Sequence, residues 1–517
     1  MDIPRYGHAF ALSCYSHPYI LFSTIFVLHL LLNRFRSHLQ SIPGPAAAAY
    51  TRLWKLYDVW KGYHHLNLIK LHYEYGPVVR IGPKHVSISD PTAIPLIYGM
   101  SPFTKTGFYP VFGLPWNKQT QMTIFSTQDE HFNRTKKKLI ASAYSLSNLL
   151  SLEPFVDSCL ALLLSRIGDI ASGSGSVDLG EWLLWFSFDV IGEISFAKRL
   201  GFLDQGQDVD GIISSIHGIM RYGMLAGQMP ESHWILLGNP LLPRIIPSIQ
   251  SANQVLTFTL QAINTRASLQ VNGELSGTTA EPGNDMLSRW LAAKDKPNSK
   301  ITTRDIVVQL SENVFAGSDT TAITLRAIFY FLCKNPLKMT KLVNTIDARA
   351  KEGKLSDPVQ YKETATHLPY VYAVMKESMR LNPASGFLLE RHVPLGGTTI
   401  AGHYIPAGTV VGMSPWAVQR DPNVFPDPES FIPERWIESP PEKLKEMEQA
   451  FLAFGSGARI CLGRHIATLE VFKLLPQLLR VFSVELDPPD RELKTRSAVL
   501  VLQDGLICKL VPRQTSK

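Results

Sequence analysis

Cysteine and charge are both scarce in this sequence, and each deficit excludes a class of protein. The 517 residues include only five cysteines, widely scattered and without a CxxC pair. This excludes a disulfide framework and a cysteine-based zinc site, and it predicts that the folded part lies in a reducing compartment. Charged residues make up 18% and hydrophobic residues 45%, which excludes a disordered chain and a coiled coil. A net charge of +7 is too dilute at this length to indicate nucleic-acid binding.

Long apolar runs are scarce as well, and the candidate for a membrane span lies at the N-terminus. Residues 19–32 would form a helix of about 21 Å, shorter than a hydrocarbon core of about 30 Å. Extension back to Ala9 gives about 36 Å, which suffices to cross, although two histidines and a proline then lie inside. A cleaved signal peptide is the alternative, but the run begins late and no small-x-small cleavage site follows it. We therefore expect an uncleaved anchor with a basic flank over residues 1–41, with the remainder held in the cytosol.

The rest of the chain predicts one large domain. The Pro-Gly-Pro of residues 42–49 cannot continue a helix and is typical of a stiff hinge. No linker or repeat interrupts residues 50–517. Residues 76–95 alternate short β-branched runs with glycine and proline, which favours a small antiparallel sheet, whereas helical periodicity dominates residues 128–335. The expected fold class is mainly α with a minor antiparallel β part, behind an N-terminal membrane helix.

The densest chemical signal is the loop FGSGARICLG at residues 454–463. Its glycines let the backbone turn tightly and approach a flat ligand closely. Cys461 lies just before an apolar helical run, and a sulfur at a helix N-terminus is expected to have a lowered pKa, which favours the thiolate, a strong iron ligand. Arg459, two residues earlier, can neutralise a nearby carboxylate. A cysteine by itself is more often a small buried hydrophobe, so the interpretation depends on the motifs that accompany it.

A second motif lies in the middle of a long predicted helix. A capping box at residues 302–305 and the Asn-Pro after Lys334 predict a helix over residues 303–334, about 48 Å long. Small residues such as Ala316 share one face with Thr320 and leave space beside a cofactor. A threonine within a helix can also bond back to the carbonyl four residues earlier. A close helix–helix contact is the alternative explanation for the hexapeptide AGSDTT at residues 316–321.

A charged pair marks a third predicted helix, which Pro369 opens and Pro383 closes. Glu377 and Arg380 lie three residues apart and therefore on the same face. Their neighbours are apolar, and a buried ion pair needs further hydrogen-bond donors. We therefore expect a structural role for this pair.

These motifs, in this order, resemble those of the cytochrome P-450 family, whose cysteine thiolate is the axial ligand of haem iron. The resemblance covers about residues 43–512 and implies a haem b cofactor with Cys461 as the metal ligand. It implies that Phe454 shields the sulfur and that Arg435 completes the Glu377–Arg380 lock. It further implies that Arg459 and Arg391 contact haem propionates. The remaining haem contacts that we carry over are Gly455, Gly463 and Ala316.

The sequence departs from the family at the basic helix FNRTKKKLIASAYS. Asn133 and Lys137 stand where the family usually has Trp or His and, four residues later, a propionate-binding Arg. Both can bond a carboxylate, but lysine lacks the bidentate fork of arginine. We expect both to contact the haem propionates, with a solvated helix face as the alternative for Lys137. Lys136 and Lys138 are expected on the surface, where an acidic reductase can meet them.

The resemblance implies a monooxygenase that uses O2 and electrons from an NADPH-cytochrome reductase, with cytochrome b5 as a further candidate donor. Thr320 and Asp319 are expected to deliver protons during oxygen activation. The segments GFLLERHVPLGG, GHYIPAGTVVGM and FIPERW are most similar to fungal members of the endoplasmic reticulum membrane, near the pisatin demethylase group. A haem-thiolate isomerase or dehydratase that needs no O2 is the main alternative, and the intact Asp319–Thr320 pair disfavours it. A haem-based gas sensor is a further alternative, and it is disfavoured because we expect no second domain that could transmit its signal.

The substrate is expected to be a small lipophilic molecule, such as a fungal secondary metabolite. An aromatic stripe is more often plain core than a binding site, so the signal is weak. The residues that suggest an apolar pocket are Phe103, Phe108, Tyr109, Phe112, the segment 220–229 and the segment 387–389.

Overall fold

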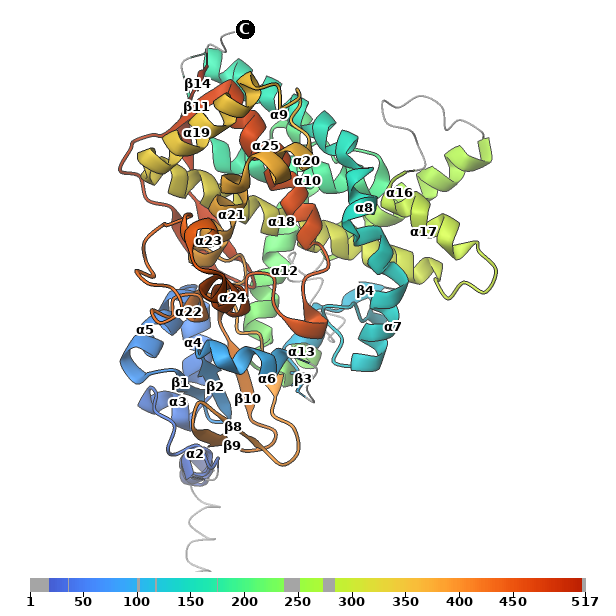
Figure 1. Cartoon of the computed structure of the whole chain (residues 1–517). Coiled ribbons are helices and arrows are strands. Elements are labelled where there is room, and N and C mark those ends of the chain that lie inside the picture. The colour runs from blue at the N-terminus through green and yellow to red at the C-terminus, as the bar shows by residue number, and fades with distance from the viewer. Residues whose placement is uncertain are drawn as a thin grey trace, which may run out of the picture.

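The structure is a computed structural model, and the residues it describes are 18–35, 37–99, 103–116, 119–173, 175–236, 252–272 and 284–513. Helices make up most of this part, with the sheet of β1 (Val78–Gly82), β2 (His85–Ile88) and β10 (Val410–Met413) near one end of the molecule and β11 (Phe482–Leu486) and β14 (Ile507–Pro512) near the other (Figure 1). The prediction of a mainly α fold with a minor β part is confirmed.

The first half of the chain contributes short helices and strands around the first sheet and then longer helices. Its helices are α2 (Pro18–Phe35), α3 (Ala46–Tyr50), α4 (Leu53–Lys61), α5 (His64–Tyr75), α6 (Ile94–Tyr98), α7 (Glu130–Ile140), α8 (Leu146–Leu150), α9 (Glu153–Ser172), α10 (Leu179–Phe196), α11 (Phe202–Gln205), α12 (Ile212–Ala226) and α13 (Pro230–Leu236). Its strands are β1 (Val78–Gly82), β2 (His85–Ile88), β3 (Thr104–Lys105), β4 (Leu114–Trp116), β5 (Gln119–Gln121) and β6 (Ser176–Asp178).

The second half contributes the longest helix and the remaining strands. Its helices are α16 (Ala252–Asn272), α17 (Met286–Lys294), α18 (Thr303–Lys334), α19 (Pro336–Lys351), α20 (Tyr361–His367), α21 (Pro369–Leu381), α22 (Pro415–Val418), α23 (Arg435–Glu438), α24 (Pro441–Ala450) and α25 (Arg464–Val481). Its strands are β7 (Arg391–His392), β8 (Thr398–Ile400), β9 (His403–Ile405), β10 (Val410–Met413), β11 (Phe482–Leu486), β12 (Lys494–Ser497), β13 (Val501–Asp504) and β14 (Ile507–Pro512).

The largest sheet joins strands that lie far apart in the sequence. Its order is β1-β2-β10-β7-β3, so two strands from the second half of the chain lie between β2 and β3 of the first half. The antiparallel hairpin of β1 and β2 confirms the sheet predicted for residues 76–95. The pair β2–β10 is parallel, unlike the purely antiparallel expectation, because these strands come from distant segments and no hairpin turn fixes their direction. At the edge, β3 pairs with β7, which sets Lys105 directly opposite Arg391.

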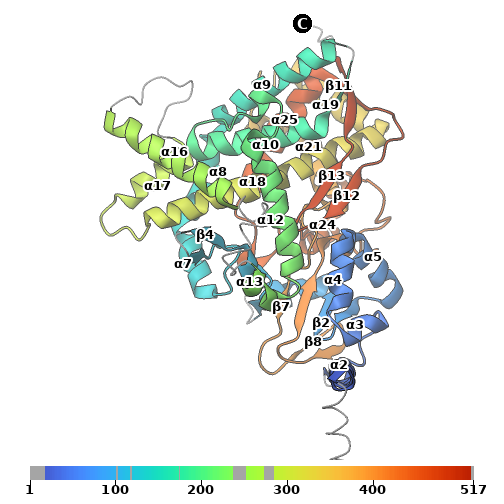
Figure 2. The same cartoon turned by 180° about the vertical axis from the view of Figure 1, so that it is seen from behind.

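Helix α18 forms the centre of the fold and has the predicted bounds. Thr302 and Asp305 form the expected capping box at its start. The helix lies beside α10 in both views, and most of its residues between Ile306 and Leu332 are buried (Figures 1 and 2). Helix α21, which carries Glu377 and Arg380, and helix α25, which follows the cysteine loop, also pack on α18.

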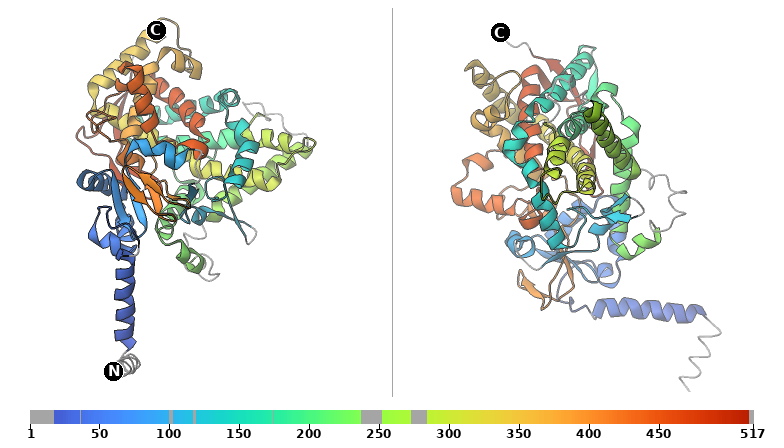
Figure 3. Two further views of the ribbon diagram at one scale, coloured as in Figure 1. Left: turned by 60° about the horizontal axis from the view of Figure 1, so that its bottom comes forward. Right: turned by 90° about the vertical axis from the view of Figure 1, so that its right-hand side faces the viewer.

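Helix α2 projects from the folded domain (Figure 3). Its apolar side chains, such as Phe22 and Ile25, are exposed. Among the described residues, no helix combines the length and the apolarity needed to cross a membrane. The predicted anchor covers residues 1–41, of which 1–17 and 36 lie outside the described part. The segment 42–49 packs on the first sheet, where the Arg80 N–H donates to the Pro43 carbonyl over 2.7 Å.

Candidate active site

The cysteine loop is closed by its own backbone. The N–H of Cys461 donates to the carbonyl of Phe454 over 2.9 Å. Gly457 has a φ of +64°, and a Cβ at this position would lie 1.7 Å from the Tyr98 carbonyl oxygen. Glycine is therefore required at position 457 both for the left-handed backbone and for the close approach to α6.

The thiol of Cys461 lies just before the start of α25. The side chain is accessible, yet burial raises the pKa of the thiol. That effect outweighs the N–H groups of Gly463 and Arg464, which point to the sulfur, and the nearby cations. The expected lowering of this pKa is therefore wrong, because the sequence argument considered the helix end and not the desolvation. Ligation does not require the lowering, since a coordinated metal cation deprotonates a thiol outright.

The central part of α18 forms another wall of this region. Ala316 is exposed in the middle of a buried helix, and the Thr320 Oγ1 donates to the Ala316 carbonyl over 2.8 Å, as the sequence predicts. A Cβ on Gly317 would lie 2.8 Å from Ile191 of α10, so the hexapeptide serves a close helix contact as well. Tyr144 packs against this wall, because its hydroxyl donates to Asn313 of α18.

Asp319 is buried and contacts a residue that the sequence did not predict. Its Oδ1 lies 2.9 Å from the Nε2 of His217 on α12. Its Oδ2 has no hydrogen-bond partner within the described part of the chain. Burial opposes the charged form of His217, but the contact with Asp319 outweighs it and raises the histidine pKa. No local pattern joins two residues 102 positions apart, so the sequence carries no signal for this pair.

Three cations gather beside the aromatic residues of the predicted pocket. Arg391 donates to the Tyr109 hydroxyl over 3.1 Å, and Lys105 lies opposite Arg391 across the β3–β7 pair. The guanidinium of Arg459 forms an ion pair of 2.7 Å with Glu130 and donates to the Ile124 carbonyl. Burial together with Arg459 and Arg391 holds the pKa of Lys105 well below its usual range. The sequence argument named the two arginines and missed the lysine.

The two residues of the basic helix α7 are placed differently from each other. The Nζ of Lys137 donates to the Ala458 and Ile460 carbonyls over 3.0 and 3.1 Å, and so it holds the cysteine loop. Asn133 is buried. Lys136, expected at the surface, forms a 2.5 Å ion pair with Asp305 at the start of α18. Contact of Asn133 and Lys137 with haem propionates stays a prediction.

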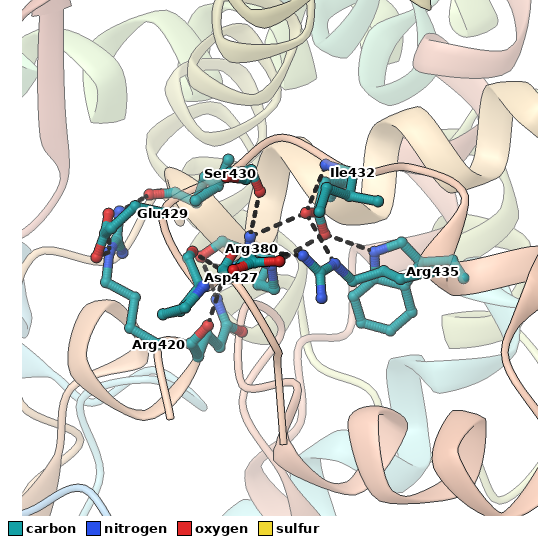
Figure 4. Close-up of polar contacts among 12 residues, drawn as sticks. Arg380, Arg420, Asp427, Glu429, Ser430, Ile432 and Arg435 are labelled. Atoms are coloured by element: carbon teal, nitrogen blue, oxygen red, sulfur yellow. Dashed lines mark hydrogen bonds and ion pairs between the residues drawn. The ribbon is translucent and has the colours of Figure 1, made fainter. Parts of the chain in front are cut away.

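The structure brings Glu377, Arg380 and Arg435 together in a buried network (Figure 4). Glu377 accepts from Arg380 over 2.9 Å and from Arg435 over 3.1 Å. The Trp436 indole and the Ile432 N–H also donate to its carboxylate. Arg380 donates further to three backbone carbonyls, as Figure 4 shows in part. A buried ion pair with its lone pairs satisfied in this way is stable, whereas the loss of one partner leaves an uncompensated charge.

The residues of this region fit an iron porphyrin. A thiol supplies the soft ligand, and small residues on the facing helix leave room for a flat ring. The three cations Lys105, Arg391 and Arg459 are buried, and among the described residues only Arg459 forms an ion pair, with Glu130. They therefore suit a ligand that carries carboxylates. Phe454, half-buried beside the Phe451 ring, precedes the sulfur in the loop.

Aromatic rings extend from the cations and form an apolar wall. Neighbouring rings have centroids between 5.2 and 6.3 Å apart. The rings of this wall are Phe108, Tyr109, Phe112, Phe125 and Phe387. Three of the four aromatic residues predicted from the segment 103–112 belong to it, whereas Phe103 lies in a separate core cluster. Phe125 was not predicted.

Comparison with known proteins agrees with the geometry. Residues 43–509 match the family model described as cytochrome P-450. The cytochrome P-450 monooxygenase cicH of Emericella nidulans is 40% identical over 497 residues, which cover 95% of this chain and 98% of that protein. A cytochrome P-450 monooxygenase of Aspergillus terreus is 38% identical over 89% of this chain and 93% of its own length. Another from Aspergillus flavus is 35% identical, with 90% and 91% covered.

Proposed function

The chain belongs to the cytochrome P-450 family and is a monooxygenase with haem b as its cofactor, and we propose that it oxidises a small lipophilic secondary metabolite. The observation that carries the substrate proposal is the wall of five aromatic rings beside Arg391 and Lys105. Apolar walls with a few polar groups are typical of sites for lipophilic ligands. Met220 and Met224 of α12 are buried near this wall, since the Phe112 ring packs closely on Gly223.

Different residues of the chain are proposed to hold the cofactor and to supply protons. Haem b, when bound, supplies the iron at which O2 is activated for insertion of one oxygen atom into the substrate. Cys461 would hold the iron through its sulfur, and Arg391 and Arg459 would hold carboxylates of the porphyrin. The Oδ1 of Asp319 contacts the Nε2 of His217 over 2.9 Å, and the Thr320 hydroxyl donates to the Ala316 carbonyl. The side chain of His217 is 28% exposed, so protons can reach Asp319 through it from solvent.

The electron donor and the location are part of the same proposal. We infer that an NADPH-cytochrome reductase, alone or with cytochrome b5, supplies the electrons at the endoplasmic reticulum membrane. The exposed apolar side chains of α2 and the basic Arg34 at its end support attachment to a membrane. Placement near the pisatin demethylase group rests on the similarity of the segments around Arg391 and Arg435. Fractionation of producing cells, followed by detection of the protein in washed microsomes, tests the location.

The proposed reaction is tested with microsomes that contain the protein, NADPH and a panel of lipophilic metabolites. We expect a product that carries one oxygen atom from labelled O2. Product formation that continues in the strict absence of O2 would instead favour an isomerase or dehydratase. Replacement Cys461→Ser is expected to abolish the red-shifted Soret peak of the reduced carbonyl adduct, and a retained peak would contradict the assignment of the ligand.

A further inference from the structure

Two of the five cysteines, far apart in the sequence, meet where α18 ends. Cys508 lies on β14, the middle strand of the sheet β11-β14-β6, and its side chain is fully buried. Cys333 lies in the last turn of α18, and its Sγ donates to the Val484 carbonyl of β11 over 3.6 Å. Val484 stands two residues from Leu486, the cross-strand partner of Cys508. The strand pairing therefore brings the end of α18 beside Cys508.

The two thiols contact each other. A hydrogen bond to Cys333, together with burial, raises the pKa of the Cys508 thiol, so Cys508 keeps its proton. A hydrogen bond raises the pKa of a group when the protonated form donates it, so the Cys508 S–H points to the Cys333 sulfur. The accessibility of the two thiols differs, since Cys508 is buried and Cys333 is half-buried. A small solute therefore reaches Cys333 first.

This contact differs from the burial of a cysteine as a small hydrophobic side chain. Cys159 of α9 is buried in that way and hydrogen-bonds to Ser158. Cys333 and Cys508 instead combine a reachable sulfur with a second sulfur behind it. An accessible thiol beside a resolving thiol is the arrangement of cysteines that respond to oxidants. In a reducing compartment such a pair forms a transient bond and not a permanent framework.

We propose that hydrogen peroxide oxidises Cys333 and Cys508 to a reversible disulfide, which ties the end of α18 to β14. The oxidant is related to the reaction of the protein, because two-electron reduction of O2 without oxygen insertion gives hydrogen peroxide. The bond closes a long stretch of chain, and such a bond stabilises a fold by restricting the unfolded chain. Thr320 and Asp319 lie several turns earlier in α18, so the bond leaves them in place.

The reaction balances with one molecule of peroxide. The sulfur of Cys333, as the thiolate, attacks one peroxide oxygen, the O–O bond breaks, and the released hydroxide takes up the thiol proton to form water. Cys333 is then a sulfenic acid. The sulfur of Cys508 attacks this sulfur, the S–S bond forms, the S–O bond breaks, and the hydroxyl leaves with the Cys508 proton as a second water. Two electrons pass from the thiols to the peroxide, and a dithiol reductant restores both thiols by exchange.

The test compares reduced, haem-loaded protein with samples exposed to hydrogen peroxide or to diamide, which oxidises thiols and leaves the haem intact. Free thiols are alkylated with iodoacetamide in denaturant, and the peptides are mapped by mass spectrometry without reduction. We expect peptides linked through Cys333 and Cys508 in both oxidised samples, and their separation by dithiothreitol. We also expect the midpoint of thermal unfolding to rise by about 2–4 °C in the diamide sample.

Matched variants separate this pair from the other cysteines. Cys333→Ser and Cys508→Ala are each expected to lose the linked peptides and the rise in the unfolding midpoint, whereas Cys159→Ala is expected to keep both. The reduced carbonyl spectrum of each sample verifies that the thiolate ligand is intact. If Cys508→Ala is not recovered folded, Cys333→Ser, at the half-buried position, gives the comparison alone.

Two results would overturn the disulfide itself. One is that both cysteines are recovered alkylated after both treatments, which shows that the thiols do not join. The other is that Cys333 is recovered as a sulfinic acid while Cys508 is alkylated, which shows that the buried thiol does not resolve the sulfenic acid. Linked peptides with an unchanged unfolding midpoint would overturn the stabilising role of the bond.

Discussion

Gly457 occupies a point in the cysteine loop where a side chain has no room. Its φ is +64°, and the Tyr98 carbonyl oxygen lies where a Cβ would be. Gly353, after α19, has a nearly equal φ of +67° but no atom within 4 Å of the corresponding Cβ position. The two glycines therefore separate backbone strain from steric exclusion.

We expect Gly457→Ala to lose bound haem and Gly353→Ala to retain it. The control change costs only the left-handed strain, about 1–2 kcal/mol. At position 457 the loop must also move away from α6, which displaces Cys461. The measurement is the haem content per protein together with the reduced carbonyl spectrum. Equal haem content in the two variants would show that the loop tolerates a methyl group there.

The sequence alone predicts some residues of the candidate site and misses others. Cys461, Arg459 and the Glu377 lock were predicted because each stands in a short motif with fixed spacing. Lys105 and His217 were not, because their roles come from contacts across 286 and 102 positions of the chain. Only the strand pairing and the helix crossing, which depend on the whole fold, place these side chains.

At the scale of elements, the contact between α12 and α18 is electrostatic as well as apolar. His217 of α12 faces Asp319 of α18, with Arg326 on the same helix and Asp208 before α12 also acting on it. Asp319 outweighs burial and raises the pKa of His217, so folding favours the protonated imidazole. This stabilisation is present in full below the unfolded pKa of about 6.5 and fades as the pH rises through the raised folded value.

We therefore expect the stability difference between the wild type and His217→Gln to be largest in mildly acidic solution. Loss of the buried partner of Asp319 should cost about 1–3 kcal/mol there. The difference should shrink as the pH rises above about 6.5 and through the raised folded pKa of His217. Denaturant unfolding at several pH values measures it, with His403→Gln on the β8–β9 hairpin as control. A difference that grows with pH would contradict the assigned direction.

Elements with local signals were predicted to within a residue or two. The bounds of α18 follow from a capping box at one end and Asn-Pro at the other, and both act within a few residues. The sheet order β1-β2-β10-β7-β3 has no such signal, because β3 and β7 are only two residues long. Short strands carry too little periodicity to be recognised, and their partners are set by packing.

At the scale of the whole molecule, Arg80 joins the N-terminal segment to the domain. Its guanidinium donates to the Ser37 hydroxyl over 2.8 Å and to the Ala49 carbonyl over 3.3 Å. It also reaches the Asn33 carbonyl at the end of α2. Burial lowers its pKa to about 10, and it remains charged at neutral pH.

We expect Arg80→Met to release this segment while the haem site stays intact. The freed carbonyls can turn to water, so the cost is about 1–3 kcal/mol and local. Limited proteolysis should cut faster between residues 37 and 50, with an unchanged reduced carbonyl spectrum. Arg52→Met, which removes an exposed pair with Glu231, should leave the cleavage rate near that of the wild type. Loss of the spectrum in Arg80→Met would show that the segment supports the active site directly.

The interleaved order of the largest sheet bears on how the protein is made. Strand β2 leaves the ribosome early, but its neighbour β10 ends at Met413, and Cys461 follows later still. A nascent chain thus holds neither the paired edge that carries Arg391 nor the predicted iron ligand until most of translation is over. Prosthetic-group capture is accordingly a late step of biosynthesis, and truncated translation products should emerge without colour.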